Sequence, residues 1–201
     1  MREQGRIMIE IFTIFDINGI AYDAVLNNGI PLLNLKGIIL PVFSFQVHGI
    51  NEYNEYWLKN GKYHRDPNQG PAYQYAGGVA NGGDETYFVD GKYHRDPNQG
   101  PAKQWDGGVA NGGGESYWVN GIKHRDPNQG PATQYYGGLV NGGSKTYWVD
   151  GKRHRDPNQG PARQWNGGVA NGGEEEYWIN GSWYASREAA IIAWTERENE
   201  L

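Results

Sequence analysis

The stretch His-Arg-Asp-Pro-Asn-Gln-Gly-Pro-Ala occurs four times in this chain without a change, beginning at His64, His94, His124 and His154. The copies are 30 residues apart, and a fixed period of this length is the sequence signature of a repeat architecture. Nine identical residues that include His, Arg and Asp are either an active site copied four times or a corner that every unit of the fold must turn. Catalytic residues are usually single, whereas every reactive side chain here recurs, so we interpret the stretch as the corner.

The residues before each corner predict a β-hairpin. The run 146–149 is β-branched and aromatic, Asp150-Gly151 follows it, and 152–155 leads into the next corner. An Asn-Gly or Asp-Gly pair between two such runs favours a type I′ turn, because both central residues of that turn need φ > 0. A further short strand is expected over 102–105, and the glycine-rich 107–113 then leads to the next hairpin.

The sequence therefore predicts an all-β fold, an elongated repeat array of 30-residue antiparallel β-hairpin or meander units with two or three short strands each. Residues 56–185 are the tandem repeats, and no α-helix is expected there because Gly and Pro recur and no window shows a 3.6-residue period. Residues 1–55 are a divergent N-terminal β segment or cap. Because 15–22 parallels 117–124, this segment is either a degenerate repeat or a separate element.

Residues 186–201 are the expected C-terminal helical cap. Ser186 is the expected N-cap, and Glu188 suits the positive first turn of a helix. We expect Ile191, Ile192 and Trp194 to form an apolar side that lies over the final hairpin, since a repeat array needs its last edge covered.

The units also alternate, with Asp90 and Asp150 where the other units have Asn60, Asn120 and Asn180. Duplication of a 60-residue block of two units would explain this pattern without any structural difference between the units. The alternative is that successive units face opposite ways and so meet different neighbours.

Composition limits the function classes. The chain has 201 residues, no cysteine and a net charge of −5, which excludes disulfides and thiolate metal sites and favours an intracellular, cytoplasmic protein. No segment is strongly basic, so duplex nucleic acid is a poor candidate partner. No stretch is long and apolar enough to predict membrane insertion.

No metal or cofactor is expected. Successive histidines of the array would lie roughly 10–15 Å apart if each unit adds two or three strands, too far to share a metal ion, and we expect each imidazole to bond backbone in the turn that follows it. The Asp-Pro-Asn-Gln corner lacks the ligand spacing of a calcium loop. It is typical of a β-turn with Asp first and Pro second.

The candidate binding surface has two parts. The arginines Arg65, Arg95, Arg125 and Arg155 could grip a polyanion, although an Asp follows each one and favours internal bonds that brace the corners. The second part is aromatic, because adjacent residues such as Tyr117 and Trp118 must point to opposite faces of a strand. Rings left exposed at regular spacing suit a sugar, single-stranded nucleic acid or a protein, and the candidates are Trp105, Trp118, Trp148, Trp165 and Trp178.

The unit resembles a known repeat family. Tyr-Trp-Val-Asn-Gly before the corner and Gly-Pro-Ala with an aromatic after it are similar to the "W-x-x-NGK-x-HR-x-x-GPA" repeats of many bacteriophage and large-virus proteins, and to MORN-type (membrane occupation and recognition nexus) β-hairpin repeats. The likeness covers roughly 56–182. Two departures are the longer corner, with Asp-Pro-Asn-Gln inserted, and the extra Val-Ala-Asn-Gly-Gly stretch between units.

The resemblance implies a scaffold or binding surface rather than a catalyst. The leading hypothesis is therefore a non-enzymatic, viral or phage binding protein in a host cytoplasm, with a protein as its partner and inhibition of a host defence complex as one role. The alternatives are a repeat lectin that uses the tryptophans, and an anion-binding surface for RNA. The edge strands of the array could also pair two copies into a homodimer.

Overall fold

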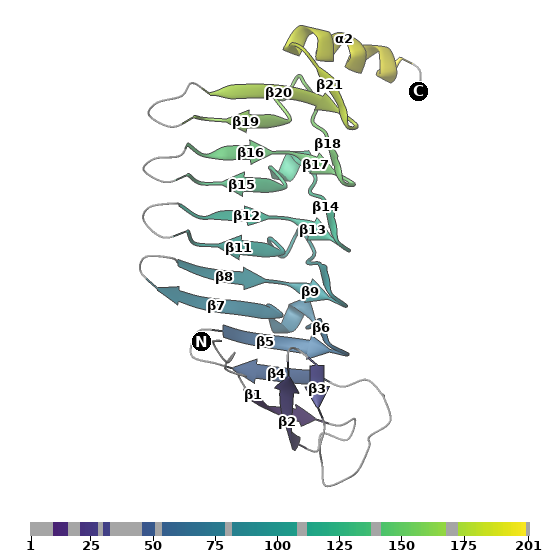
Figure 1. Ribbon diagram of the computed structural model, residues 1–201. Coiled ribbons are helices and arrows are strands. Elements are labelled where there is room, and N and C mark those ends of the chain that lie inside the picture. Colours follow the sequence, from purple (N-terminus) through teal and green to yellow (C-terminus); the bar gives the residue numbers. More distant parts are fainter. Residues whose placement is uncertain are drawn as a thin grey trace, which may run out of the picture.

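The computed structural model describes residues 10–15, 21–27, 30–32, 46–50, 54–78, 82–107, 112–137, 142–167 and 173–199. It is mostly β, with one long antiparallel sheet, a series of short hairpins along one side and a helix after the last strand (Figure 1). The predicted all-β class, built from antiparallel hairpins and followed by a C-terminal helix, is confirmed.

The long sheet has the strand order β21-β20-β19-β16-β15-β12-β11-β8-β7-β5-β4-β1-β2-β3, with β6 paired to β5. Its strands are β1 (Glu10–Phe15), β2 (Ala21–Asn27), β3 (Ile30–Leu32), β4 (Gln46–Ile50), β5 (Asn54–Lys59), β6 (Lys62–Tyr63), β7 (Tyr73–Gly78), β8 (Gly82–Thr86), β11 (Lys103–Trp105), β12 (Gly114–Ser116), β15 (Thr133–Tyr135), β16 (Ser144–Thr146), β19 (Arg163–Trp165), β20 (Glu174–Ile179) and β21 (Ser182–Tyr184). Segment 1–55 thus continues the sheet through β1 to β4. The predicted degenerate hairpin at 15–22 has Phe15 paired with Ala21, while its turn residues lie outside the described residues.

Three hairpins lie beside the sheet and stack on one side of it (Figure 1). They are β9 (Phe88–Val89) with β10 (Lys92–Tyr93), β13 (Trp118–Val119) with β14 (Ile122–Lys123), and β17 (Trp148–Val149) with β18 (Lys152–Arg153). A unit such as β12 to β15 therefore has four short strands instead of the two or three expected. The strand is interrupted at Tyr117, whose N–H still bonds the Ala132 carbonyl, and beyond it the chain pairs within the β13–β14 hairpin.

The hairpin turns follow the prediction. Asn120 and Gly121 have φ of 53° and 84°, and the pairs at 60–61, 90–91, 150–151 and 180–181 also have positive φ at both residues. This left-handed backbone is the one that a type I′ turn requires. Successive hairpins are joined by backbone bonds, such as Gly121 N–H to the Tyr93 carbonyl (2.8 Å) and Arg95 N–H to the Trp118 carbonyl (3.1 Å).

The corner is the predicted β-turn. The Asp96 carbonyl accepts from Gln99 N–H at 2.9 Å, and the Asp96 carboxylate accepts from Asn98 N–H at 2.9 Å. Two of the corners form 3₁₀ turns, η1 (Pro67–Gln69) and η2 (Pro127–Gln129). Each of the last three corners also bonds the corner before it, as Gln99 Nε2 does by donating to Asn68 Oδ1 at 3.0 Å.

The histidine prediction was wrong about the partner. His94 Nδ1 accepts the N–H of Asn120 at 3.1 Å, in the hairpin turn of the next unit rather than in the turn that follows the histidine. The same bond joins His64 to Asp90, His124 to Asp150 and His154 to Asn180. Since every unit makes this bond in the same way, successive units do not face opposite ways. Duplication is the explanation of the Asn/Asp alternation that remains.

The core is narrow. Its fully buried side chains include the alanine that ends each corner (Ala72, Ala102, Ala132, Ala162), and beside these lie the buried tyrosines Tyr87, Tyr117 and Tyr147. With so small a residue inside, much of the buried area comes from tyrosine rings packed between units.

Helix α2 (Arg187–Glu198) covers the end of the array. Ser186 is its N-cap as predicted, with Oγ accepting from Ala189 N–H at 3.2 Å. The predicted apolar side was wrong at Ile192, which is 60% exposed, whereas Ala190 is fully buried. At 100° per residue, position 192 points away from the side that carries 190 and 194. No helix in the described ranges is long and apolar enough to cross a membrane.

Candidate binding groove

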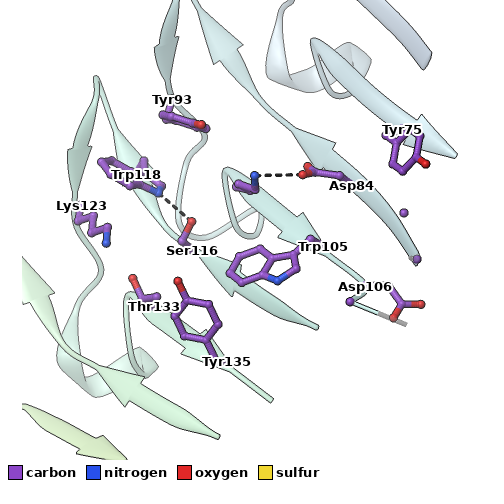
Figure 2. A pocket seen from close by; sticks show the side chains of 14 residues that line it. Tyr75, Asp84, Tyr93, Trp105, Asp106, Ser116, Trp118, Lys123, Thr133 and Tyr135 are labelled. Carbon is purple, nitrogen blue, oxygen red and sulfur yellow. Dashed lines mark hydrogen bonds and ion pairs between the residues drawn. The ribbon is translucent and has the colours of Figure 1, made fainter. Parts of the chain in front are cut away.

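A groove of about 690 Å³ runs between the long sheet and the hairpins. Its floor comes from sheet strands, with Trp105 of β11, Ser116 of β12, and Thr133 and Tyr135 of β15. Its other wall comes from the hairpins, with Tyr93, Trp118 and Lys123. Figure 2 shows these side chains converging on one hollow. The groove exists because the chain leaves the sheet at Tyr117 and the hairpin then faces the sheet.

Trp105 is held in place from two sides. A Cβ built on Gly114, its cross-strand partner, would lie 2.3 Å from Trp105 Cζ2, so the indole covers a position that only glycine leaves open. Tyr135, 51% exposed, meets Trp105 edge to face at 5.2 Å between centroids. The pair is a rigid aromatic platform on the groove floor.

A column of side chains runs along the hairpin wall. It begins with rings, where Tyr63, Phe88, Tyr93 and Trp118 follow one another at centroid distances of 5.3, 4.5 and 5.2 Å. It continues with cations between indoles. Lys123 Nζ is 5.1 Å from the Trp118 ring and 5.2 Å from the Trp148 ring, and Arg153 lies between Trp148 and Trp178. The column thus changes from aromatic to cationic along the array.

The lysines that line the groove and the arginines that lie beyond it differ in their partners. Lys103 is paired with Asp84 at 3.0 Å, and both Arg153 and Arg163 bond the Glu176 carboxylate. Glu176 therefore has a pKa below its usual value, even though burial acts in the opposite direction, because Trp178 and the two arginines donate to it or attract its charge. Lys123 has no carboxylate partner in the described part of the chain. Burial first, and then the charge of Arg153, lower the pKa of Lys123.

Two hydroxyls lie on the groove floor. Ser116 Oγ accepts from the Trp118 indole N–H at 2.8 Å, which fixes the orientation of that indole (Figure 2). Thr133 is only 6% exposed, and its Oγ1 has no hydrogen-bond partner. An unpaired buried hydroxyl is uncommon and costs free energy unless something else bonds it.

The predicted tryptophans fall in three places. Trp105 and Trp118 line the groove. Trp148 and Trp178 belong to the hairpin column, and Trp178 also lines a second hollow of about 660 Å³ with Arg153, Trp183 and Glu174 to Glu176. Trp165 is half-buried in β19, opposite Ser144 and Glu174.

The predicted arginines lie in the corners and do not line the groove. Each stacks on an aromatic ring, with Cζ 3.5–4.0 Å from the centroids of Trp57, Tyr87, Tyr117 and Tyr147. Each also donates from Nη1 to the proline carbonyl six residues later, at 3.1–3.2 Å. Arg65, Arg95, Arg125 and Arg155 are thus held against the chain by internal bonds that brace the corners.

Sequence reasoning missed the polar groove residues Asp84, Lys103, Ser116, Lys123 and Thr133, together with Tyr135. A signal for them is present in the differences between otherwise identical units. Across the units that begin at 84, 114 and 144, every groove position not occupied by glycine varies. The varying sets are Asp84/Gly114/Ser144, Thr86/Ser116/Thr146, Phe88/Trp118/Trp148, Tyr93/Lys123/Arg153, Lys103/Thr133/Arg163, Trp105/Tyr135/Trp165 and Asp106/Tyr136/Asn166.

Elsewhere in the described part of these units, variation is confined to the positions of Glu85, Asp90 and Lys92. Random drift after duplication would scatter differences over all faces, the corner included. Their concentration in the groove marks it as the surface on which the units have diverged.

The described residues give little support for a metal site. In the parts of the chain that the structure describes, no three His, Asp or Glu side chains gather into a group that could hold a metal ion. The imidazole Nδ1 atoms already accept backbone N–H groups.

No protein-family model, curated protein or solved structure matches this chain.

Proposed function

We propose that the chain is a non-catalytic binding scaffold that holds a partner along the groove between its sheet and its hairpins. The observation that carries this proposal is the internal variation. Units with identical corners differ at each groove position that bears a side chain. Such a division between a constant frame and a varied surface is typical of repeat proteins that bind through an extended face.

The absence of a catalytic role is part of the proposal. Ser116 and Thr133 are the aliphatic hydroxyls of the groove, and no histidine lines it, since the described histidines of the corners bond backbone turns. A nucleophile needs a base within hydrogen-bond reach. The side chains of the groove thus suit recognition better than covalent chemistry.

A protein partner is supported by the resemblance to phage and large-virus arrays. On that basis we propose a viral or phage protein acting in a host cytoplasm, where inhibition of a host defence complex is one use of such a scaffold. An RNA surface has less support, because the corner arginines stack on rings and because Lys103 of the groove, like Arg153 and Arg163 beyond it, has a carboxylate partner. A glycan is the second candidate, favoured by the Trp105–Tyr135 platform.

The test is capture with matched variants. The immobilised protein is exposed to bacterial and eukaryotic lysates at about 0.15 M salt, with and without nuclease, and retained molecules are identified and quantified. Tyr135→Ala removes a groove ring, while Tyr136→Ala removes a neighbouring ring that is equally exposed but bonds Glu115 and does not line the groove. We expect the partner to be lost with Tyr135→Ala and kept with Tyr136→Ala. Equal retention by both variants would place the binding surface elsewhere and refute the proposal.

Self-association through strand edges is a separate proposal. β21 ends the strand order of the long sheet, and α2 packs against β20 and β21. Light scattering on the purified chain measures its mass, and a monomer at all concentrations would exclude a stable homodimer.

A further inference from the structure

We propose that the central groove binds an acidic oligosaccharide, with sugar rings on Trp105 and Tyr135 and a sugar carboxylate beside Lys123. This inference rests on the proposed role of the groove as the binding surface, and it names the chemical class of the ligand. It does not depend on the partner being a protein.

The aromatic platform of Trp105 and Tyr135 suits a sugar ring. Trp105 is fixed over Gly114 and against Tyr135, and the Lys103 ammonium lies over its ring at 5.8 Å from the centroid. A sugar that packs on this platform would therefore meet a ring already ordered and a cation beside it. A pyranose has one face of C–H groups that packs on an aromatic ring and a rim of hydroxyls that needs polar partners. The groove offers both kinds of contact, since Asp84 and Ser116 line it together with the rings (Figure 2). Lys103 also lines it.

The sheet strands of the groove floor are not open to strand addition by a peptide. In that mode an extended peptide gains affinity by adding a strand to a free sheet edge. Here β8, β11, β12 and β15 each pair with a strand on both sides, so their backbone groups are already engaged. A ligand on this floor is recognised through side chains, which favours a sugar over a peptide strand.

The charge of Lys123 favours an acidic ligand. Its ammonium is half-buried between two indoles without a carboxylate nearby, while the neighbouring Lys103 is already paired. A carboxylate placed there would compensate for the lost hydration of the ammonium. The same environment lowers the pKa of Lys123, which is the expected effect of a cation that lacks its counter-charge.

The small number of unpaired cations in the groove favours an acidic sugar over a nucleic acid as the ligand. Of the two cations that line the groove, Lys103 is paired with Asp84, and Lys123 has no carboxylate partner in the described part of the chain, so the groove offers one unpaired cation over the units that line it. Each unit adds two sheet strands, or roughly 10 Å of groove, whereas a nucleic acid brings a phosphate at every nucleotide. A glycan with a carboxylate on some of its rings matches this sparse charge.

Thr133 adds an independent observation. Its hydroxyl lies on the floor next to the Tyr135 and Lys123 side chains, is nine-tenths buried, and bonds nothing in the free protein (Figure 2). A hydroxyl or carboxylate of a bound sugar would supply the missing partner.

The experiment titrates the full chain with oligogalacturonate, and with the same oligomer after methyl esterification, by calorimetry and tryptophan fluorescence. We expect the acidic oligomer to bind and the ester to bind roughly tenfold more weakly or not at all. Tyr135→Ala and Lys123→Gln should each weaken binding by about fivefold or more. The matched controls Tyr136→Ala and Lys145→Gln, in which Lys145 is an exposed cation of β16 outside the groove, should bind like the wild-type chain.

Each other outcome overturns part of the reasoning. Equal binding of acid and ester, or no effect of Lys123→Gln, would refute the acidic sugar. If no oligomer binds while a lysate partner is still lost with Tyr135→Ala and kept with Tyr136→Ala, the ligand class is wrong and the proposed function stands. If capture is also insensitive to Tyr135→Ala, the groove is not the binding surface and both fail. Far-ultraviolet circular dichroism and melting of each variant show that a loss of binding is not a loss of fold.

Discussion

The corner arginines provide the sharpest test of the structure, because the same side chains were candidates for a polyanion surface. Arg125 stacks with Cζ 3.8 Å from the centroid of buried Tyr117 and donates to the Pro131 carbonyl at 3.1 Å. Its side chain is 17% exposed. A hydrogen bond from a charged donor contributes about 1.5–3 kcal/mol, and a partly desolvated cation–π contact about 1 kcal/mol. Replacing the guanidinium should therefore destabilise the array by about 2–4 kcal/mol.

Two substitutions separate structure from charge. Arg125→Met keeps the apolar stem but loses both interactions, so it should lose the full amount. Arg125→Lys keeps the charge but not the planar fork that stacks and donates at the same time, so it should lose about half. Unfolding in urea, followed by tryptophan fluorescence, measures the midpoints, and binding of single-stranded RNA is measured in parallel. If Arg125→Lys matches the wild-type midpoint while Arg125→Met abolishes RNA binding without lowering stability, the bracing role is wrong and the anion surface is right.

Three further predictions concern one bond between units and two backbone positions. His154 accepts the Asn180 N–H, and burial together with the charge of Arg197 lowers the pKa of His154 despite the opposing effect of Asp156. Because the unfolded chain then binds the proton more readily, the free energy of unfolding should fall as the pH drops below about 6.5. A melting series from pH 7.5 to 5 should show this fall in the wild-type chain and a smaller one in His154→Gln, and parallel curves would contradict it. Gly130 has φ of 126°, and a Cβ there would lie 3.1 Å from Arg125 Nη1. Gly130→Ala should therefore lower the free energy of unfolding in urea by about 1–3 kcal/mol. An unchanged midpoint would show that the backbone of the corner is not constrained. Asn120→Gly should leave the midpoint nearly unchanged while Asn120→Ala lowers stability by about 1 kcal/mol, because φ is 53° there; equal effects of the two would argue against a type I′ turn.

The elements that could be predicted are those set by neighbours in the sequence. Asn-Gly and Asp-Gly need left-handed backbone, so their turns follow from two residues. The Asp-Pro-Asn-Gln corner likewise closes on itself through the carboxylate and carbonyl of its own Asp. Ser186 was identifiable as the N-cap because a capping side chain bonds a residue three positions later.

What could not be predicted depends on contacts between units. The partner of His94 is 26 residues away, at Asn120, and nothing local distinguishes it from the turn that follows the histidine. The groove was missed for a related reason. A pleat alone predicts that Tyr117 and Trp118 point to opposite faces, but it does not predict that the chain leaves the sheet at Tyr117 and turns Trp118 toward Trp105.

The identity of the corners and the variety of the groove have one physical explanation. The bonds that join successive units use backbone groups and two corner side chains, namely His to the next turn and Gln to the previous Asn. Within each unit, the corner Arg bonds its own ring and carbonyl, as Arg125 does with Tyr117 and Pro131. A change in any of these would weaken an interface that every unit depends on, since a repeat array is stable only through its neighbours. The groove side chains contribute less to the contacts between units. Lys103, Thr133 and Arg163 share one strand position, yet the three strands keep the same pairing on both sides. The corner can therefore stay constant while the groove changes, and this separation allows one frame to present a different chemistry in each unit.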